Sequence, residues 1–450
     1  MEYNTDLELK QKMDNSQTIC LLNDSFPPVI DGVANAVANY AQMIHEAGQD
    51  TVVITPSHPE SDDTLFPYPV VRYPSLDFRK KTGGYTAGIP FSPVITRQLA
   101  DRKVALLHAH CPIVSTILGR ELRRVVDAPL VMTYHTKFDI EIRKMIRGRA
   151  LRAGTTRALV QNISACDEVW AVSSGAADNL RSMGYEGECI VMPNGVDLPC
   201  GRVSQEEICR ATQAYDLPQD VPVFLFVGRI MWYKGLKIIA DALAMQKALG
   251  AQYRMVFIGS GADQEEVEAY IDRCGIADRC IFTGPIRDRE VLRAWYSRAD
   301  LFLFPSTFDT NGLVVREAAA SSLGAVLIAG SCAAEGITDG VNGLLIDESA
   351  ESLSACLTRV LREPEIMARV GEHAARELYL SWHDAVHNAM ERYEIVIDRY
   401  RSGRRPAHLE PMEQLLETAG ALMEDLAQIP PLPPLRRQDK EGNDLPFFKK

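Results

Sequence analysis

Two carboxylates flank the start of a predicted helix in the second half of the chain. Both follow an apolar run at 301–304 that predicts a buried strand, and they stand eight positions apart. Asp309 lies in the loop after this strand, and Glu317 lies within an Ala-rich helix expected at 313–322. A helix starting at Gly312 would direct free backbone N–H groups and its positive dipole end above the strand, which suits a diphosphate. The two carboxylates are therefore predicted to contact opposite ends of one bound molecule. The same arrangement of strand, loop, helix and two acids is also common in α/β proteins where it binds no ligand.

Two cations stand in an earlier loop of the same kind. Arg229 and Lys234 lie five positions apart, between a strand that ends at Gly228 and the next helix. An Arg fork together with a Lys point charge suits a diphosphate. Two later strands run into glycines, one of them at Gly259. Because the carboxyl ends of parallel strands meet at one edge of a sheet, we expect these loops to converge on one site.

The first half of the chain opens with a strand, loop, helix and strand. The strand at 18–22 leads into a loop with Gly32, where the missing side chain would let a ligand approach the backbone. The loop is not GxGxxG, which argues against a dinucleotide site. His108, His110 and His135 follow two later strands, and we expect one of them to contact substrate. Zinc binding by the HxH pair stays a weaker alternative, since neither a third ligand nor an HExxH helix is evident.

Length and composition restrict the class of protein. The chain has 450 residues, enough for two or three domains, with 46% hydrophobic and 24% charged residues, as in a soluble globular protein. A net charge of −12 argues against general affinity for nucleic acid. The 10 cysteines show no CxxC or zinc spacing, so they are expected to be reduced. There is no signal-peptide pattern and no apolar run long enough to span a bilayer, so we expect a cytoplasmic protein.

One segment, residues 137–157, is unusually basic. It carries seven basic and two acidic residues interleaved with apolar ones, a pattern that predicts a basic amphipathic helix. Such a helix suits an anionic membrane surface, here the inner face of the plasma membrane, although a solvated basic face over a core stripe explains the pattern equally well. The predicted membrane contacts are Lys137, Arg143, Lys144, Arg147 and Arg149.

Taken in order, the motifs resemble a known family. PPVIDGV, YHT, PNGVD, VGRIMWYKG, FIGSG, FTGPI and the acid pair, spread over residues 18–393, are similar to those of retaining GT-B glycosyltransferases. That family contains diacylglycerol glucosyltransferases and glycolipid mannosyltransferases. The resemblance implies an α/β fold of two Rossmann-like, doubly wound parallel-sheet domains that face each other across a cleft. The implied order is an N-terminal tail at 1–16, an acceptor domain at 17–200, a donor domain at 201–380, a crossover helix at 381–400 that packs on the N-terminal domain, and a Pro-rich, disordered tail at 401–450.

The resemblance also implies roles for single residues. Arg229 and Lys234 would bind the donor diphosphate, Glu317 the ribose hydroxyls, Ile286 the base through its backbone, and His135 the sugar near C6. Catalytic roles are implied for Asp309, Glu317, Arg229, Lys234 and His135. Contacts to the nucleotide sugar are implied for Gly32, Gly228, Gly259, Ile286, Asn311, Gly312 and Leu313. In one respect the chain departs from the family pattern, because Asp309 stands where the family has Glu.

The implied reaction transfers a hexose, with glucose from UDP-glucose as first choice, to a lipid or glycolipid hydroxyl such as that of diacylglycerol. The configuration would be retained, the leaving phosphate oxygen would take the acceptor proton, and neither metal nor cofactor would be needed. Two alternatives remain open. The acceptor could be a soluble sugar or polysaccharide, or the Asp309 change could mark a nucleotide-sugar-binding protein without catalysis.

Overall fold

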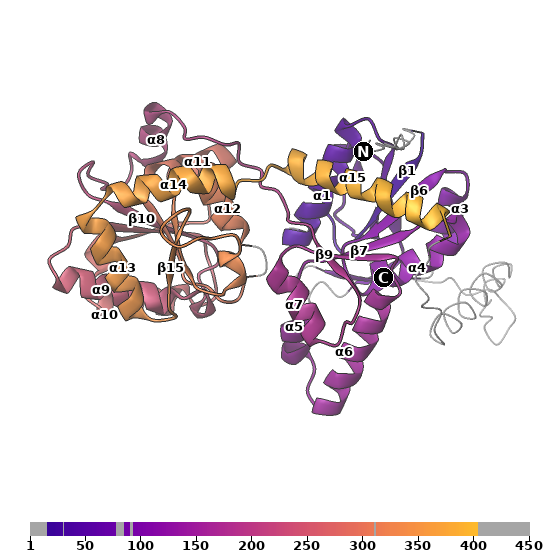
Figure 1. The fold of residues 1–450 in the computed structure, drawn as a ribbon, viewed down its shortest axis with the longest axis horizontal. Coiled ribbons are helices and arrows are strands. Elements are labelled where there is room, and N and C mark those ends of the chain that lie inside the picture. The colour runs from indigo at the N-terminus through magenta and orange to yellow at the C-terminus, as the bar shows by residue number, and fades with distance from the viewer. Residues whose placement is uncertain (1–15, 30, 78–84, 91–92, 310–311, 404–450) are drawn as a thin grey trace, which may run out of the picture.

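The chain forms two lobes, each built on a parallel sheet with helices on both faces (Figure 1). The computed structural model describes residues 16–29, 31–77, 85–90, 93–309 and 312–403. Two Rossmann-like parallel-sheet lobes are the predicted fold class, which is thereby confirmed. Of the two predicted tails, residues 1–15 and 404–450 lie outside the described residues.

The amino-terminal lobe holds a seven-stranded sheet in the order β3-β2-β1-β6-β7-β8-β9, with every neighbouring pair parallel. Its strands are β1 Thr18–Leu22, β2 Thr51–Pro56, β3 Val70–Tyr73, β6 Val104–Ala109, β7 Leu130–Tyr134, β8 Glu168–Ala171 and β9 Cys189–Val191, and β4 Ser75–Asp77 pairs with β5 Thr86–Gly88 beside it. Its helices are α1 Gly32–Glu46, η1 Asp63–Leu65, α3 Pro93–Ala100, α4 Val114–Val126, α5 Phe138–Met145, α6 Arg149–Ser164 and α7 Ser174–Ser182. Every residue of β1 is buried, because helices cover both faces of the sheet.

The carboxy-terminal lobe holds a six-stranded parallel sheet in the order β12-β11-β10-β13-β14-β15. Its strands are β10 Val223–Val227, β11 Arg254–Ile258, β12 Cys280–Gly284, β13 Leu301–Phe304, β14 Ala325–Ile328 and β15 Leu344–Ile346. Its helices are α8 Gln205–Thr212, η2 Trp232–Lys234, α9 Leu236–Ala248, α10 Gln264–Arg273, η3 Ala277–Arg279, α11 Arg289–Arg298, α12 Leu313–Ala320, η4 Cys332–Ala334, α13 Ala350–Arg362 and α14 Glu365–Glu377. In this sheet the chain reverses its winding between β10 and β13, which leaves a crevice at the strands' carboxyl ends.

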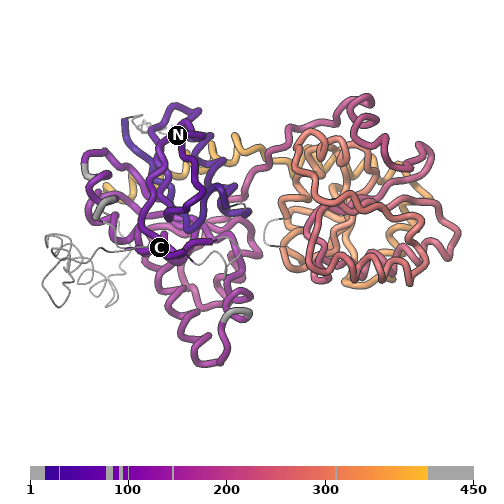
Figure 2. Tube along the Cα trace, turned by 180° about the vertical axis from the view of Figure 1, so that it is seen from behind, coloured from indigo at the N-terminus to yellow at the C-terminus, as the bar shows by residue number. Residues whose placement is uncertain are grey.

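The last helix, α15 (Trp382–Arg401), returns to the amino-terminal lobe and packs against α1 (Figures 1 and 2). Its Tyr393 is fully buried there. The carboxylate of Glu168 accepts hydrogen bonds from Arg392 at 2.7 Å and from Arg399 at 2.5 Å, which anchors the helix. The segment that leaves the amino-terminal lobe at Gly195 contacts the segment that returns to it at Trp382. A Cβ on Gly195 would lie 2.4 Å from the Trp382 nitrogen.

Two details of the predicted elements are wrong. The basic segment 137–157 is not one helix, because the chain is extended at Ile146 and takes a positive φ of 104° at Gly148, so α5 and α6 are separate. His108 does not follow its strand but lies inside β6, with its ring nitrogens bonded to Tyr393 and Thr133 in the buried core.

Candidate active site

The loops that follow β10 and β11 lie in direct backbone contact. A Cβ on Gly259 would stand 2.0 Å from the Gly228 carbonyl oxygen, and Gly259 has a φ of 136°. The Ile230 nitrogen donates to the Ser260 carbonyl at 3.1 Å, which joins the two loops. Any side chain at Gly259 would push them apart, so the glycine is required by packing and by φ together. The predicted convergence of these loops is therefore present at this edge of the sheet.

The structure brings Lys234 and Asp309 together. The Lys234 side chain is 8% exposed, and its Nζ donates to Asp309 Oδ1 at 2.5 Å. The other carboxylate oxygen of Asp309 accepts from Ser306 Oγ at 2.6 Å. Gly235 makes this approach possible, since a Cβ there would stand 2.0 Å from the Pro305 carbonyl oxygen. One predicted cation, Lys234, and one predicted carboxylate, Asp309, thus neutralise each other across two loops.

Arg229 lies farther out than Lys234. It is exposed, with its guanidinium carbon 5.9 Å from the centre of the Tyr233 ring. It also lies close enough to Tyr85 of the amino-terminal lobe to influence the pKa of that phenol. Burial raises the pKa of Tyr85 to about 12, the charge of Asp31 raises it further, and the charge of Arg229 lowers it. Arg229 therefore stands where the two lobes face each other.

Helix α12 begins with an open amino terminus. Gly312 precedes it in the left-handed conformation, at φ 57° and ψ 40°, and no side chain of the described residues caps the helix. The Val315 nitrogen already donates to the Gly312 carbonyl at 2.8 Å. Among the described residues, the N–H groups of Leu313 and Val314 therefore remain to face an anion. Asn311, predicted to contact the same ligand, lies outside the described residues. Ile286, predicted to contact the base, is half-buried just beyond β12.

Glu317 is held by two side chains that sequence reasoning missed. Its Oε1 accepts from Arg289 Nη2 at 2.7 Å and its Oε2 from the Tyr296 hydroxyl at 2.9 Å. Burial, with the nearby Glu317 charge, raises the pKa of Tyr296 well above its usual value, so the phenol stays a donor. Arg289 and Tyr296 stand seven positions apart on α11, two turns along one face, and that spacing is the signal that could have found them. Glu317 and Asp309 do not touch each other but bind different partners.

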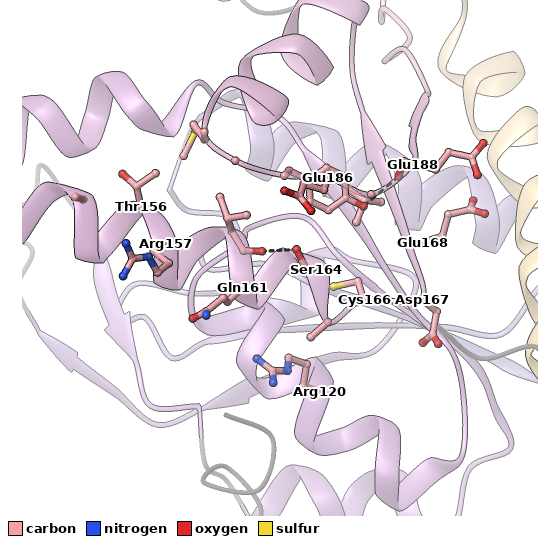
Figure 3. Close-up of a pocket in the computed structure, with 18 of the residues that line it drawn as sticks. Arg120, Thr156, Arg157, Gln161, Ser164, Cys166, Asp167, Glu168, Glu186 and Glu188 are labelled. Carbon is pink, nitrogen blue, oxygen red and sulfur yellow. Dashed lines mark hydrogen bonds between the residues drawn. The ribbon is translucent and has the colours of Figure 1, made fainter. Parts of the chain in front are cut away.

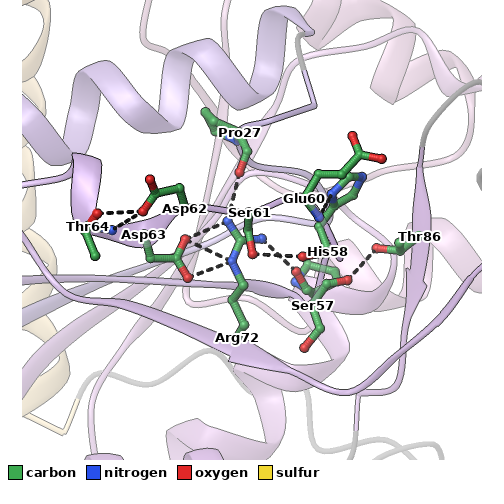
Figure 4. A network of polar contacts seen from close by, with 11 residues as sticks. Pro27, Ser57, His58, Glu60, Ser61, Asp62, Asp63, Thr64, Arg72 and Thr86 are labelled. Atoms are coloured by element: carbon green, nitrogen blue, oxygen red, sulfur yellow. Dashed lines mark hydrogen bonds and ion pairs between the residues drawn. The ribbon is translucent and has the colours of Figure 1, made fainter.

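The amino-terminal lobe contributes the loop before α1. Asp31 caps this helix, because its Oδ1 accepts from the Val33 and Ala34 nitrogens at 2.8 Å each. Gly32 is the first helical residue, and a Cβ there would meet no atom within 4 Å, so the space beside it is open. Arg72 fixes the loop by donating to the Pro27 carbonyl at 2.8 Å while it pairs with Asp63 of η1 (Figure 4).

His135 stands directly after β7 and belongs to a buried histidine pair. Its Nε2 lies 3.0 Å from His110 Nδ1, so one of the two nitrogens donates and the other accepts. Burial lowers the pKa of His135 to about 4, with Asp31 opposing the shift. Near neutral pH its imidazole is therefore uncharged and suited to hydrogen bonding. In the described part of the chain, no three His, Cys, Asp or Glu side chains gather in a way that could hold a metal ion.

A carboxylate of the carboxy-terminal lobe caps a helix of the amino-terminal lobe. Glu335, which follows η4, accepts hydrogen bonds from the Ser174 nitrogen at 2.8 Å and the Gly175 nitrogen at 3.3 Å, at the start of α7. Gly175 also packs on Cys332, whose Sγ would stand 2.3 Å from a Cβ there. These contacts join the lobes beside the start of α12, and sequence reasoning did not single them out.

A large cavity lies away from these residues. It has a volume of about 980 Å³ and is bounded by α6, by the turn before β9 and by Asp167 and Glu168 (Figure 3). Asp167 and Glu168 stand at the amino-terminal end of β8, whereas β8 leads at its other end toward α7 and Glu335. Because ligands of such sheets bind beyond the carboxyl ends of strands, this cavity is not the candidate active site.

The predicted membrane-contact residues lie on the α5–α6 pair, which projects from the amino-terminal lobe (Figure 1). Arg143, Arg147 and Arg149 are exposed, and Arg143 pairs with Asp139. Lys137 is half-buried just before α5, and the side chain of Lys144 lies outside the described residues. No helix in the described ranges is both long and apolar enough to cross a membrane.

Comparison with known proteins identifies both lobes. Residues 30–199 match the model for Glycosyltransferase Family 4, and residues 210–377 match that for Glycosyl transferases group 1. The α-monoglucosyldiacylglycerol synthase of Acholeplasma laidlawii is 25% identical over 80% of this chain and 94% of its own length. A D-inositol 3-phosphate glycosyltransferase of Xylanimonas cellulosilytica is 30% identical over 62% of this chain and 68% of its own length.

The arrangement of the two lobes also occurs in solved structures. Anabaena HepE in complex with UDP superposes with a TM-score of 0.67 at 18% identity, covering 84% of this chain and 99% of that one. A second structure of HepE holds UDP-glucose. At this level of identity, the likeness concerns the fold.

Proposed function

The chain belongs to the GT-B glycosyltransferases, and we propose that it transfers a hexose, glucose carried by UDP, to the hydroxyl of a membrane lipid such as diacylglycerol. The observation that carries the proposal is the meeting of Lys234, Asp309 and the open start of α12 at one edge of the donor-side sheet. A cation and free helix N–H groups at that edge suit the diphosphate of a nucleotide sugar.

In the proposed donor pose, the carboxy-terminal lobe holds the nucleotide and the diphosphate. Arg229, Lys234 and the first N–H groups of α12 would hold the diphosphate, and Glu317, fixed by Arg289 and Tyr296, would bond the ribose. The diphosphate would compete with Asp309 for Lys234 and so release Asp309 to bond sugar hydroxyls. Asp is one methylene shorter than the Glu of the family pattern, which the close packing of the two loops at Gly235 would offset.

The proposed reaction needs no nucleophile from the protein. As the bond from the sugar to the phosphate breaks, the charges of Arg229 and Lys234 would stabilise the leaving diphosphate. The acceptor hydroxyl would enter on the same face, and the departing phosphate oxygen would take its proton, so configuration is retained. The neutral imidazole of His135 would hydrogen-bond the sugar near C6. We propose that neither metal nor cofactor takes part.

Different relatives support UDP-glucose as the donor and a lipid as the acceptor. HepE binds UDP and UDP-glucose, and the Acholeplasma relative is a monoglucosyldiacylglycerol synthase. The exposed arginines of α5 and α6 would face the anionic inner surface of the plasma membrane in a peripheral, cytoplasmic enzyme. A soluble acceptor is the second candidate, because the 30% identical relative acts on D-inositol 3-phosphate.

A panel of donors tests the proposal. We would measure nucleotide release with UDP-, GDP- and ADP-sugars, with and without anionic vesicles that contain diacylglycerol, and with Glu317→Ala as a site control. Lipid-dependent turnover of one UDP-hexose, lost in the control, supports the proposal. Turnover that needs only a soluble acceptor supports the second candidate, and tight UDP binding without turnover of any donor would indicate a binding protein.

A further inference from the structure

A second cavity of the amino-terminal lobe lies between α4, α5 and α6. Its volume is about 410 Å³, within the range of about 300–1,000 Å³ found for small-molecule sites. Carbon atoms make up nearly all of its surface, chiefly those of Ile113, Ile117, Phe138, Ile142, Ile146 and Leu159. Such a surface favours an apolar ligand.

One buried polar side chain beside this cavity, that of Asn162, is hydrogen-bonded to the protein itself. Asn162 donates from Nδ2 to the Pro112 carbonyl at 2.8 Å and to the Ile113 carbonyl at 3.2 Å. Its Oδ1 accepts from Arg120 Nη1 at 2.9 Å. The Asn162 amide is therefore already hydrogen-bonded to the cavity wall, and it has little capacity left to bind a polar ligand.

The cavity adjoins the strand ends that carry the histidine pair. Pro112 and Ile113 follow His110 by two and three positions, and Phe138 follows His135 by three. The Phe138 nitrogen donates to the Tyr134 hydroxyl at 3.1 Å, so the entry to α5 is fixed to the end of β7. An occupant would thus lie next to the side of the cleft from which an acceptor must reach the sugar.

The mouth of the cavity suits a lipid surface. Ile113 is 45% exposed at its edge, and Leu151 is 63% exposed at the start of α6. Arg147 is exposed in the turn between α5 and α6, and Arg149 is exposed at the first position of α6. Exposed apolar side chains beside cations are the pattern of a segment that meets anionic headgroups while apolar groups enter the acyl region.

We propose that this cavity binds an acyl chain of the lipid acceptor and so draws the acceptor hydroxyl out of the membrane toward His135. The inference rests on the proposed function, since it specifies the acceptor of that same site. If the cavity binds an acyl chain, the affinity for the acceptor depends on acyl length. The donor-binding residues alone would not produce such a dependence.

A matched pair of variants on α6 tests the proposal. Ala158 lines this cavity, whereas Ala153 lines the larger cavity on the other side of α6, and both are exposed. Ala158→Trp would therefore fill the apolar cavity, while Ala153→Trp places the same ring in the larger one. We would measure transfer from UDP-glucose to dioleoylglycerol and to dihexanoylglycerol in detergent micelles, and separately the binding of pyrenedodecanoic acid by fluorescence without any donor. Thermal unfolding would verify that both variants fold.

In Ala158→Trp, we expect the KM for dioleoylglycerol to rise about tenfold with kcat little changed, the KM for dihexanoylglycerol to stay near its original value, and probe binding to weaken. Ala153→Trp should resemble the original protein in all three measurements. Normal dioleoylglycerol kinetics and normal probe binding in Ala158→Trp would overturn the proposal while leaving the transferase function intact. If the original protein glucosylates no diacylglycerol, the proposed function fails, and the probe alone decides whether the cavity binds acyl chains.

Discussion

Replacing Lys234 by Met removes one cation from the proposed donor site and leaves a side chain of similar length. The Lys234 side chain is 8% exposed and its ammonium stands 2.5 Å from Asp309, so the cation is fixed in a largely buried position. Removing one such preorganised charge or donor usually lowers kcat about 10²- to 10³-fold. We therefore expect Lys234→Met to lose about that factor in turnover at saturating UDP-glucose, because the leaving diphosphate loses its nearest charge.

The same change should also affect stability. Asp309 would remain without its cation, although it keeps the hydrogen bond from Ser306 and is 21% exposed, so water compensates in part. We expect the free energy of unfolding to fall by about 1–3 kcal/mol. The double variant Lys234→Met/Asp309→Asn no longer buries an unpaired charge and should regain most of that loss, but it should not regain turnover.

Urea unfolding and steady-state kinetics separate the two effects. Both variants and the original protein would be compared at one pH and salt concentration, with UDP release as the kinetic readout. Turnover by Lys234→Met within about threefold of the original protein would refute the electrostatic reasoning, because so small a change is worth under 1 kcal/mol. A double variant that regained turnover along with stability would also refute it.

Three further changes have defined outcomes. Gly259→Ala forces a Cβ to within 2.0 Å of a backbone carbonyl, so it should lose more unfolding free energy than Gly250→Ala, which carries only the backbone cost of about 1–2 kcal/mol; equal losses in urea would contradict the packing argument. The folded pKa of His135 lies near 4, below the unfolded value of about 6.5, so its contribution to stability is complete above pH 6.5 and is lost at about 1.4 kcal/mol per pH unit as pH falls from there toward 4. In His135→Gln, the free energy of unfolding in urea should depend less steeply on pH over that range. An unchanged pH dependence would count against a buried neutral imidazole. Glu168→Gln weakens the anchor of α15 and should cost about 2–4 kcal/mol, whereas the exposed Glu391→Gln should cost under about 0.5; similar values for both would argue against the anchor.

Several strands follow from local sequence, whereas the two-domain fold class was implied by the resemblance of the ordered motifs. The strands β1 (18–22) and β13 (301–304) have the predicted bounds. Apart from Thr18 their residues are apolar, because both faces of these sheets are covered. The loops at Gly228 and Gly259 could be placed together because parallel strands end at one edge. The break at Gly148 was missed, because a single glycine inside a helical pattern is often tolerated.

The partners of the predicted site residues could not be found in this way. Glu317 is fixed by residues 21 and 28 positions away, and Glu335 reaches Ser174 across 161 positions. Contacts of this kind depend on how whole elements pack, and a local pattern carries no information about them. The pairing of Lys234 with Asp309 is of the same type, although each residue was predicted from its own loop.

The product itself tests the central claim most directly. We would incubate the protein with UDP-glucose and anionic vesicles that contain dioleoylglycerol, extract the lipid, and determine the anomeric configuration by proton NMR. The account predicts glucosyl-diacylglycerol in the α configuration of the donor. A β-linked product would contradict the retaining reaction, and the absence of any glycolipid under conditions where a soluble acceptor is glucosylated would contradict the lipid acceptor.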